Sequence, residues 1–287
     1  MSWKGKTIAG FEGRDRLARV LAREVGAAYV SLNVSTYRAG ERVVRVSRAV
    51  TKRCLLVTDL EADGESVWLA MLGCNALRAS GAKRISLLAP WIAYGRQDRP
   101  AKSRESTGGV VLGVELSRAF RKITTLDAHS RMFRKHFGGR LKSVTPRDLI
   151  VPIARAKGAT AIAAPDRGAE KRAKTVARKL RLPFIQCEKK RLRPGLGGVR
   201  SRISSGDPKG HRVLLVDDMV DSGGTLAEAA KALRAAGART VGAVVTHAAV
   251  PASVPRAKEL GLGYLEVVYQ RDKKPGRGIV MHFKRWV

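Results

Sequence analysis

Two aspartates and a glycine-rich loop follow a short apolar run late in the chain. The run Val213–Val216 has the length and branching of a buried parallel strand. It leads into Asp217, Asp218 and a loop made of Asp221, Ser222, Gly223, Gly224 and Thr225. Glycines let a backbone approach an anion closely, and the amides at the start of a helix point toward it. Because carboxylates repel phosphate, the two aspartates indicate a ligand that also has hydroxyl groups, such as a ribose phosphate. A turn that only caps the next helix is the structural alternative.

This loop needs a strand before it and a helix after it. Residues 226–236 have the composition and apolar spacing of a helix, which Gly237 ends. Strand, loop and helix in this order bind ligands at the carboxyl ends of strands in open α/β sheets. The sequence therefore predicts an α/β fold with a ligand site at 217–225.

The same unit occurs a second time, earlier in the chain. Leu55–Val57 matches Leu214–Val216, and residues 76–82 match residues 232–238. Two copies of one strand-loop-helix-strand unit predict two domains of similar α/β fold. The earlier copy has an acidic loop, Glu61–Ser66, in place of the glycine loop. A chance likeness between two alanine-rich helices is the alternative.

Polar side chains also follow apolar runs elsewhere in the chain. Tyr94–Arg99, Asp166 and Lys189–Arg191 each come directly after such a run, where ligands bind. Residues 122–129 are predicted as a strand on which Asp127 and His129, two apart, point to one face. A carboxylate and an imidazole together can hold a hard divalent ion with phosphate oxygens. A structural histidine and a basic surface run are the alternatives.

Several of these stretches resemble the motifs of one family. The Asp221–Thr225 loop resembles the phosphoribosyl-pyrophosphate motif of type I phosphoribosyltransferases and of ribose-phosphate pyrophosphokinases. Tyr94–Arg99 resembles the Y-x-R-Q-D-R motif of the pyrophosphokinases, Asp127–His129 their D-L-H segment and Ala164–Gly168 their S-P-D-x-G segment. The resemblance spans nearly the whole chain in the family's order. It implies two tandem type I phosphoribosyltransferase-like domains, each a mostly parallel sheet flanked by helices.

The resemblance also implies a reaction, in which the diphosphoryl group of Mg-ATP passes to the 1-hydroxyl of ribose 5-phosphate. The products would be phosphoribosyl pyrophosphate and AMP. The residues implied for catalysis are Lys189 and Arg191. Those implied for ribose 5-phosphate are Asp217, Asp218, Asp221, Ser222, Gly223, Gly224 and Thr225. Those implied for ATP are Tyr37, Gly40, Glu41, Arg96, Gln97 and Arg99, and those for Mg²⁺ are Asp127, His129 and Asp166.

The sequence departs from the family's motifs mostly in the segments that the resemblance assigns to nucleotide binding. Tyr37–Glu41, which is predicted to form a turn before a strand, stands where the family has F-x-D-G-E, and it lacks the aspartate. Glu105–Gly109 replaces the usual P-I-S/T-A-K segment. A phosphoribosyltransferase that uses phosphoribosyl pyrophosphate, and a non-catalytic regulatory homologue, are the alternative functions.

The predicted domains divide near Val144. Residues 1–143 would form the N-terminal domain with the ATP motif and metal ligands, and residues 144–287 the C-terminal domain with the ribose 5-phosphate loop and the catalytic lysine. Residues 194–210, rich in glycine, serine and proline, are expected to be mobile and to close over the site. The end of the chain is expected to be strand-like.

Composition limits the partners and the compartment. The net charge is +32, but the cations are dispersed along the chain and only 5% of residues are aromatic, which argues against a dedicated nucleic-acid partner. No run of 18 apolar residues exists, so no membrane partner is expected. Three widely spaced cysteines without metal-type pairing favour buried thiols and a cytoplasmic protein. The resemblance implies a homo-oligomer, either a dimer or a hexamer.

Overall fold

The chain forms two compact units. The computed structural model describes residues 3–191, 199–271 and 273–286. The first unit consists of Met1–Val144 together with Lys273–Val287, and the second consists of Thr145–Asp272. The segment from Lys273 onward, placed in the second domain from the sequence, thus belongs to the first unit. It ends not in a strand but in helix α8 (Arg277–Lys284), which buries Phe283 and packs against α1 (Arg16–Val25).

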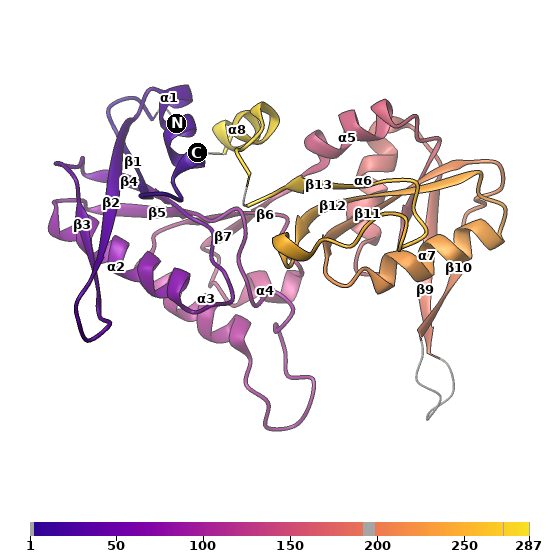
Figure 1. Ribbon diagram of the computed structural model, residues 1–287, viewed down its shortest axis with the longest axis horizontal. Helices are drawn as coiled ribbons and strands as arrows, with labels where there is room; N and C mark the ends of the chain where they lie inside the picture. The colour runs from indigo at the N-terminus through magenta and orange to yellow at the C-terminus, as the bar shows by residue number, and fades with distance from the viewer. Residues whose placement is uncertain (1–2, 192–198, 272, 287) are drawn as a thin grey trace. The chain divides into compact units, whose positions relative to one another are not determined.

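The first unit contains one seven-stranded sheet with the order β3-β2-β1-β4-β5-β6-β7 (Figure 1). Its strands are β1 (Thr7–Phe11), β2 (Ala28–Thr36), β3 (Arg42–Val46), β4 (Arg53–Val57), β5 (Arg84–Leu88), β6 (Ile123–Leu126) and β7 (Leu141–Val144). The strands pair in parallel except β2 and β3, which form an antiparallel hairpin. Crossover helices α2 (Glu65–Ala79) and α3 (Gly108–Ala119) link neighbouring parallel strands, as parallel pairing requires.

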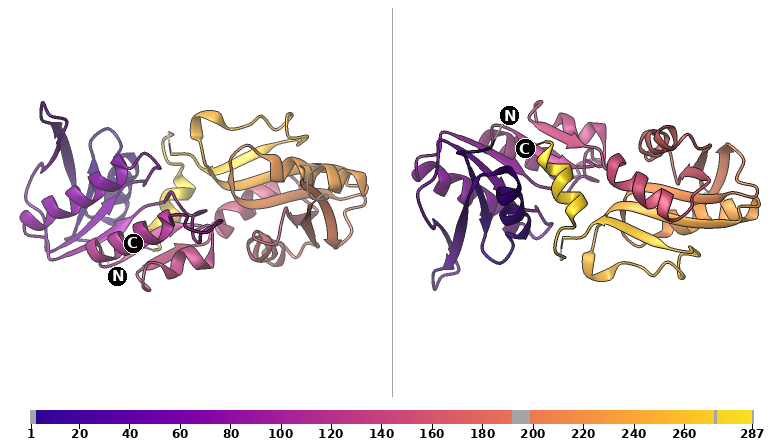
Figure 2. Two further views of the ribbon diagram at one scale, coloured as in Figure 1. Left: turned by 90° about the horizontal axis from the view of Figure 1, so that it is seen from below. Right: turned by 90° about the horizontal axis from the view of Figure 1, so that it is seen from above.

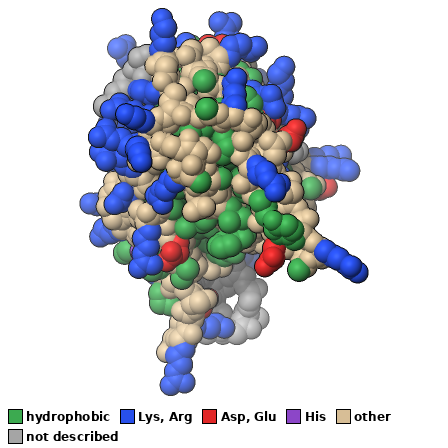
Figure 3. Space-filling model, turned by 90° about the vertical axis from the view of Figure 1, so that its left-hand side faces the viewer, with side chains coloured by type: hydrophobic (Ala, Val, Ile, Leu, Met, Phe, Trp, Pro, Cys, Tyr) green, Lys and Arg blue, Asp and Glu red, His purple; other side chains and the backbone are tan. Residues whose placement is uncertain are grey.

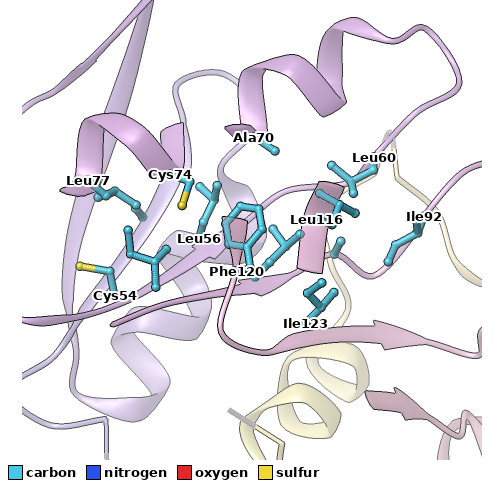
Figure 4. Packing of buried hydrophobic residues seen from close by; sticks show 14 of the residues in the cluster. Cys54, Leu56, Leu60, Ala70, Cys74, Leu77, Ile92, Leu116, Phe120 and Ile123 are labelled. Carbon is cyan, nitrogen blue, oxygen red and sulfur yellow. The ribbon is translucent and has the colours of Figure 1, made fainter. Parts of the chain in front are cut away.

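The core of the first unit lies between the sheet and these two helices. Leu56 and Ile123 on the strands pack with Cys74 on α2 and with Leu116 and Phe120 at the end of α3 (Figure 4). Because one face of each strand meets an apolar helix face, burial removes a large apolar area from water. This packing fixes the carboxyl ends of β5 and β6, which carry the predicted nucleotide and metal residues.

The cysteine thiols are buried, as predicted. Cys54, Cys74 and Cys187 are all free and buried. Burial raises the pKa of Cys54 and of Cys187 to about 11 and also raises the pKa of Cys74. We therefore expect native protein at pH 8 to react with a thiol reagent more than about a hundredfold slower than protein unfolded in guanidinium. A thiol that reacts equally fast in both states would contradict this burial.

The second unit contains a six-stranded sheet with the order β10-β9-β8-β11-β12-β13. Its strands are β8 (Ala161–Ala164), β9 (Phe184–Arg191), β10 (Val199–Ser205), β11 (Arg212–Val220), β12 (Thr240–Ala248) and β13 (Leu265–Tyr269). Helices α5 (Arg147–Ala156) and α6 (Glu170–Leu180) pack on one face, and α7 (Gly224–Ala235) packs on the other (Figure 2). All pairs are parallel except β9 with β10. This arrangement confirms the predicted fold class in both units.

The predicted internal repeat is visible in the two sheets. In the first unit β4, α2 and β5 follow one another, and in the second unit β11, α7 and β12 do the same. In each case the two strands are parallel neighbours. The matching sequence segments therefore adopt the same supersecondary structure.

Two local expectations differ from the structure. The segment expected to be mobile at 194–210 includes β10, which pairs with β9, so part of it is an antiparallel arm; residues 192–198 lie outside the described residues. The strand predicted at 122–129 ends at Leu126, because Asp127 adopts a left-handed backbone with φ 52°. Asp127 and His129 therefore do not share a strand face. No helix in the described chain is long and apolar enough to cross a membrane.

Candidate active site

The glycine-rich loop joins β11 to α7 in the second unit. Gly223 is buried with φ 81°, and a Cβ there would lie 2.6 Å from a terminal methyl of Leu260. Helix α7 begins at Gly224, and its N-cap residue, Gly223, has no side chain that could cap the first amides. Asp221, Ser222 and Gly224 are exposed, and Thr225 is half-buried. The hydroxyls of Ser222 and Thr225 together with the amides at the start of a helix can hold a phosphate group.

Asp217 and Asp218 lie within β11 (Arg212–Val220), two residues before its end, rather than after it, and both are buried. Asp217 lies 3.5 Å from the guanidinium of Arg172 on α6, and its Oδ1 accepts a 2.8 Å hydrogen bond from the amide of Asp218. Burial raises the pKa of Asp217 well above its ordinary value, and the neighbouring Asp218 raises it further. Arg172 opposes this shift. Sequence reasoning missed Arg172, whose position in a basic helix gave no signal.

Asp166 lies two residues after β8, the strand beside β11. Its Oδ1 accepts hydrogen bonds from the amides of Gly168 (3.0 Å) and Ala169 (3.3 Å), which precede α6. Its charge also raises the pKa of Asp217, so the two carboxylates belong to one electrostatic cluster. One oxygen of Asp166 is thus used by the backbone of the turn.

Lys189 and Arg191 lie at the end of β9, where the backbone pairs with β10. Ser201 is the Cα partner of Lys189, and Val199 is the partner of Arg191. Their side chains lie outside the described part of the structure. Their backbone therefore belongs to an antiparallel arm next to β8, the strand that leads to Asp166.

In the first unit, the Tyr94–Arg99 loop follows β5. Arg96, Gln97 and Arg99 are exposed, and the hydroxyl of Tyr94 donates a 3.2 Å hydrogen bond to the carbonyl of Ala62. The exposed guanidinium and amide groups suit contact with a polyanion such as a nucleotide triphosphate.

Asp98 holds the Tyr94–Arg99 loop in place through hydrogen bonds on the buried side of the loop. Its side chain is buried and accepts a hydrogen bond from the hydroxyl of Ser130, and its carbonyl lies 2.8 Å from Nε2 of His136. Ser130 also caps α4 (Arg131–Lys135), because its Oγ accepts a 2.9 Å hydrogen bond from the amide of Phe133. Sequence reasoning did not single out these positioning residues, although Asp98 lies within the motif.

The segment with Asp127 and His129 lies against the same loop. A Cβ on Gly95 would lie 3.1 Å from the Cβ of His129, so the backbones of the two segments approach closely. Asp127 and His129 are half-buried, and the amide of Asp127 donates a 2.9 Å hydrogen bond to the carbonyl of Val144. The structure thus brings the Tyr94–Arg99 loop and the Asp127–His129 segment together.

The start of α3 also packs on the Tyr94–Arg99 loop. The amide of Gly109 donates a 3.0 Å hydrogen bond to the carbonyl of Gln97. A Cβ on Gly109 would lie 2.8 Å from that carbonyl oxygen and 3.0 Å from the carbonyl oxygen of Tyr94. The sequence departure at 105–109 therefore includes a glycine that supports the loop.

Tyr37, Gly40 and Glu41 form the turn of the β2–β3 hairpin, as predicted. The amide of Tyr37 bonds to the carbonyl of Glu41 at 2.8 Å, and the amide of Gly40 bonds to the carbonyl of Tyr37 at 2.8 Å. All three residues are exposed, with Tyr37 58% exposed. The turn projects an aromatic ring into solvent.

The predicted metal ligands of the first unit, Asp127 and His129, are only partly suited to a hard divalent cation. Among the residues that the structure describes, no three His, Cys, Asp or Glu side chains lie close enough to hold a metal by themselves. Mg²⁺, however, is commonly bound by one or two carboxylates with substrate phosphates and waters. Half-buried Asp127 fits that manner of binding. The imidazole of His129 is a less suitable donor for Mg²⁺ than an oxygen.

Models of known protein families match both units of the chain. The family model described as the N-terminal domain of ribose phosphate pyrophosphokinase matches residues 7–116, and the phosphoribosyl transferase domain model matches residues 147–260. The ribose-phosphate pyrophosphokinase of Pyrococcus abyssi is 32% identical over 219 residues, which cover 76% of this chain and 76% of that protein. That of Thermococcus kodakarensis is 31% identical over 226 residues, which cover 78% of this chain and 80% of that protein.

A solved structure extends the likeness to the fold. The crystal structure of phosphoribosylpyrophosphate synthetase from Mycobacterium smegmatis matches with a TM-score of 0.76 and 25% sequence identity, and the match covers 90% of this chain and 86% of that chain. Both domain models match in sequence order, and the two relatives from Pyrococcus abyssi and Thermococcus kodakarensis are covered over three quarters of their length or more. The chain therefore belongs to the ribose-phosphate pyrophosphokinase family.

Proposed function

We propose that the chain transfers the diphosphoryl group of Mg-ATP to the 1-hydroxyl of ribose 5-phosphate. The hydroxyl oxygen bonds to the β-phosphorus, the bond from that phosphorus to the α,β-bridging oxygen breaks, and the hydroxyl proton is released. The products are phosphoribosyl pyrophosphate and AMP. The observation that carries the proposal is the presence in one chain of a glycine loop at the start of α7, after β11, and an arginine–glutamine loop after β5.

The residues of the second unit would hold the sugar phosphate. Asp221, Ser222, Gly224 and Thr225 offer the backbone amides and hydroxyls that bind the 5-phosphate. Asp217 and Asp218 lie directly before them and would accept hydrogen bonds from ribose hydroxyls. Binding of this kind orients the 1-hydroxyl, and in phosphoryl transfer orientation and charge neutralisation matter more than covalent chemistry.

The residues of the first unit would hold ATP. Arg96, Gln97 and Arg99 would contact the nucleotide, and Tyr37, Gly40 and Glu41 would contribute from the hairpin turn. Mg²⁺, when bound, would neutralise phosphate charge, with Asp127, His129 and Asp166 as its candidate ligands or as ligands of its waters. Lys189 and Arg191 would stabilise charge on the transferring diphosphoryl group.

The test is a product assay on the purified chain. With ribose 5-phosphate, ATP and MgCl₂, we expect phosphoribosyl pyrophosphate and AMP in equal amounts, measured by ³¹P NMR and chromatography. Omitting ribose 5-phosphate or adding EDTA should abolish AMP release. Pyrophosphate release from phosphoribosyl pyrophosphate and a nucleobase would favour a phosphoribosyltransferase instead. If the chain binds ribose 5-phosphate but forms neither product, a regulatory homologue is favoured.

We further propose that the chain works in the cytoplasm as a homo-oligomer, either a dimer or a hexamer. The exposed hairpin turn with Tyr37 supports this, because an exposed aromatic side chain is common at protein interfaces. Light scattering gives the mass directly, and a monomer at assay concentration would contradict the proposal.

A further inference from the structure

The amino ends of three neighbouring strands in the first unit carry pairs of cations. Lys52–Arg53 lies at the start of β4, Lys83–Arg84 at the start of β5 and Arg121–Lys122 at the start of β6. We call these six residues the basic edge, and all six are exposed. The amide of Arg84 donates a 2.9 Å hydrogen bond to the carbonyl of Lys52, so the first two pairs lie side by side. The amide of Arg121 donates a 2.9 Å hydrogen bond to the carbonyl of Ile85, so the third pair lies beside the residues that follow Arg84.

None of these cations has a carboxylate partner among the residues that the structure describes. Arg53 and Arg84 are Cα partners in the parallel register, which places two like charges on adjacent strands. The pKa of Lys122 is lowered, first by burial and then by Lys142 on the next strand. None of the six forms an ion pair within the described chain. Unrelieved repulsion of this kind costs free energy, which a bound polyanion would offset.

The basic edge lies away from the proposed nucleotide site. Tyr94–Arg99 and Asp127 follow the carboxyl ends of β5 and β6, whereas the basic edge lies at the amino ends. Five residues of strand separate the two edges by roughly 17 Å. The charge of the basic edge is therefore not explained by ATP at that site.

We propose that the basic edge binds the phosphodiester backbone of a single nucleic-acid strand. The cations are dispersed along the sequence, but the parallel sheet gathers them into a row. Adjacent strands lie about 4.8 Å apart, so the row from β4 to β6 spans about 10 Å. Figure 3 shows the side of the first unit, where Lys and Arg side chains greatly outnumber Asp and Glu.

A membrane surface fits this row less well than a nucleic acid does. Interfacial binding uses apolar side chains beside the cations. Among the described residues, no exposed large hydrophobic side chain lies in 47–53, 80–84 or 120–122. The scarcity of aromatic residues predicts binding without base preference, through charge alone.

Fluorescence anisotropy with a labelled 20-base single-stranded DNA of mixed sequence tests the proposal. We expect K83Q/R84Q/R121Q/K122Q to bind at least about tenfold more weakly at 0.1 M salt and to lower the slope of log K against log salt by about 3. The control K171Q/R178Q/K179Q/K231Q removes four exposed cations from the second unit and should change the dissociation constant less than about twofold.

Several results would overturn the proposal. These are no binding by the unmodified chain at 0.1 M salt, equal losses in the two variants, or tighter binding to phosphatidylserine vesicles than to the oligonucleotide. K52Q/R53Q, a smaller change on the same edge, replaces the first variant if that one does not fold. AMP release should be unchanged in every variant, so a failure of the proposed reaction is distinguished from a failure of nucleic-acid binding.

Discussion

Replacing Gly223 with alanine is expected to abolish ribose 5-phosphate binding and to lower the free energy of unfolding by about 2–4 kcal/mol. The backbone at Gly223 is left-handed, which costs an L-residue about 1–2 kcal/mol. The new Cβ would also lie 2.6 and 2.7 Å from the two methyls of Leu260, which is buried in the core of the second unit. Both effects displace the loop that presents Ser222 and Thr225. Titration calorimetry measures the binding, and urea denaturation measures the stability.

Gly224→Ala is the matched control. Gly224 has no positive φ, and the nearest atom to a Cβ there is the hydroxyl oxygen of Ser222 at 3.9 Å. We expect this variant to be as stable as the parent chain. Leu260→Ala combined with Gly223→Ala should restore part of the ribose 5-phosphate binding, while the loss of the buried Leu260 side chain lowers the free energy of unfolding further. If Gly223→Ala binds ribose 5-phosphate normally, the loop is not the phosphate site.

The glycine loop could be predicted from the sequence because its chemistry is local. A buried strand, two glycines and a helix fix the backbone that presents Ser222 and Thr225, whatever the rest of the chain does. The turn at 37–41 is similar, since loop length and a glycine at φ 92° determine a hairpin between two strands. The α/β class followed from the repeat of the same unit.

Other features of the fold and the site depend on contacts between residues far apart in the sequence, which a local sequence pattern cannot predict. Asp127 leaves the strand through a left-handed residue, so the alternation of faces used for Asp127 and His129 does not apply. Asp98 is buried by Ser130 and His136, which lie more than thirty residues away in sequence. The end of the chain forms a helix that buries Phe283 in the first unit. The composition of this segment did not indicate that it would pack on the first unit rather than on the second.

Gly109→Ala is expected to raise the KM for ATP by about tenfold or more while leaving the KM for ribose 5-phosphate unchanged. The new Cβ would lie 2.8 Å from the carbonyl oxygen of Gln97 and 3.0 Å from that of Tyr94. Both are backbone atoms, so the loop itself must move. Because Arg96 and Gln97 are carried by this loop, the change displaces the groups proposed to bind the nucleotide. Steady-state kinetics with each substrate varied in turn separates the two KM values.

Two other alanine variants serve as comparisons for Gly109→Ala. Gly276→Ala, in the same unit, meets no atom within 4 Å and should leave both KM values unchanged. Gly108→Ala would meet the side chains of Gln97 and Tyr94 at 2.7 Å, and side chains can rotate away, so we expect a smaller rise in the KM for ATP. A folded Gly109→Ala enzyme with a normal KM for ATP would place nucleotide binding outside the Tyr94–Arg99 loop. An equal rise in both KM values would indicate general loosening of the first unit instead of a local shift of that loop.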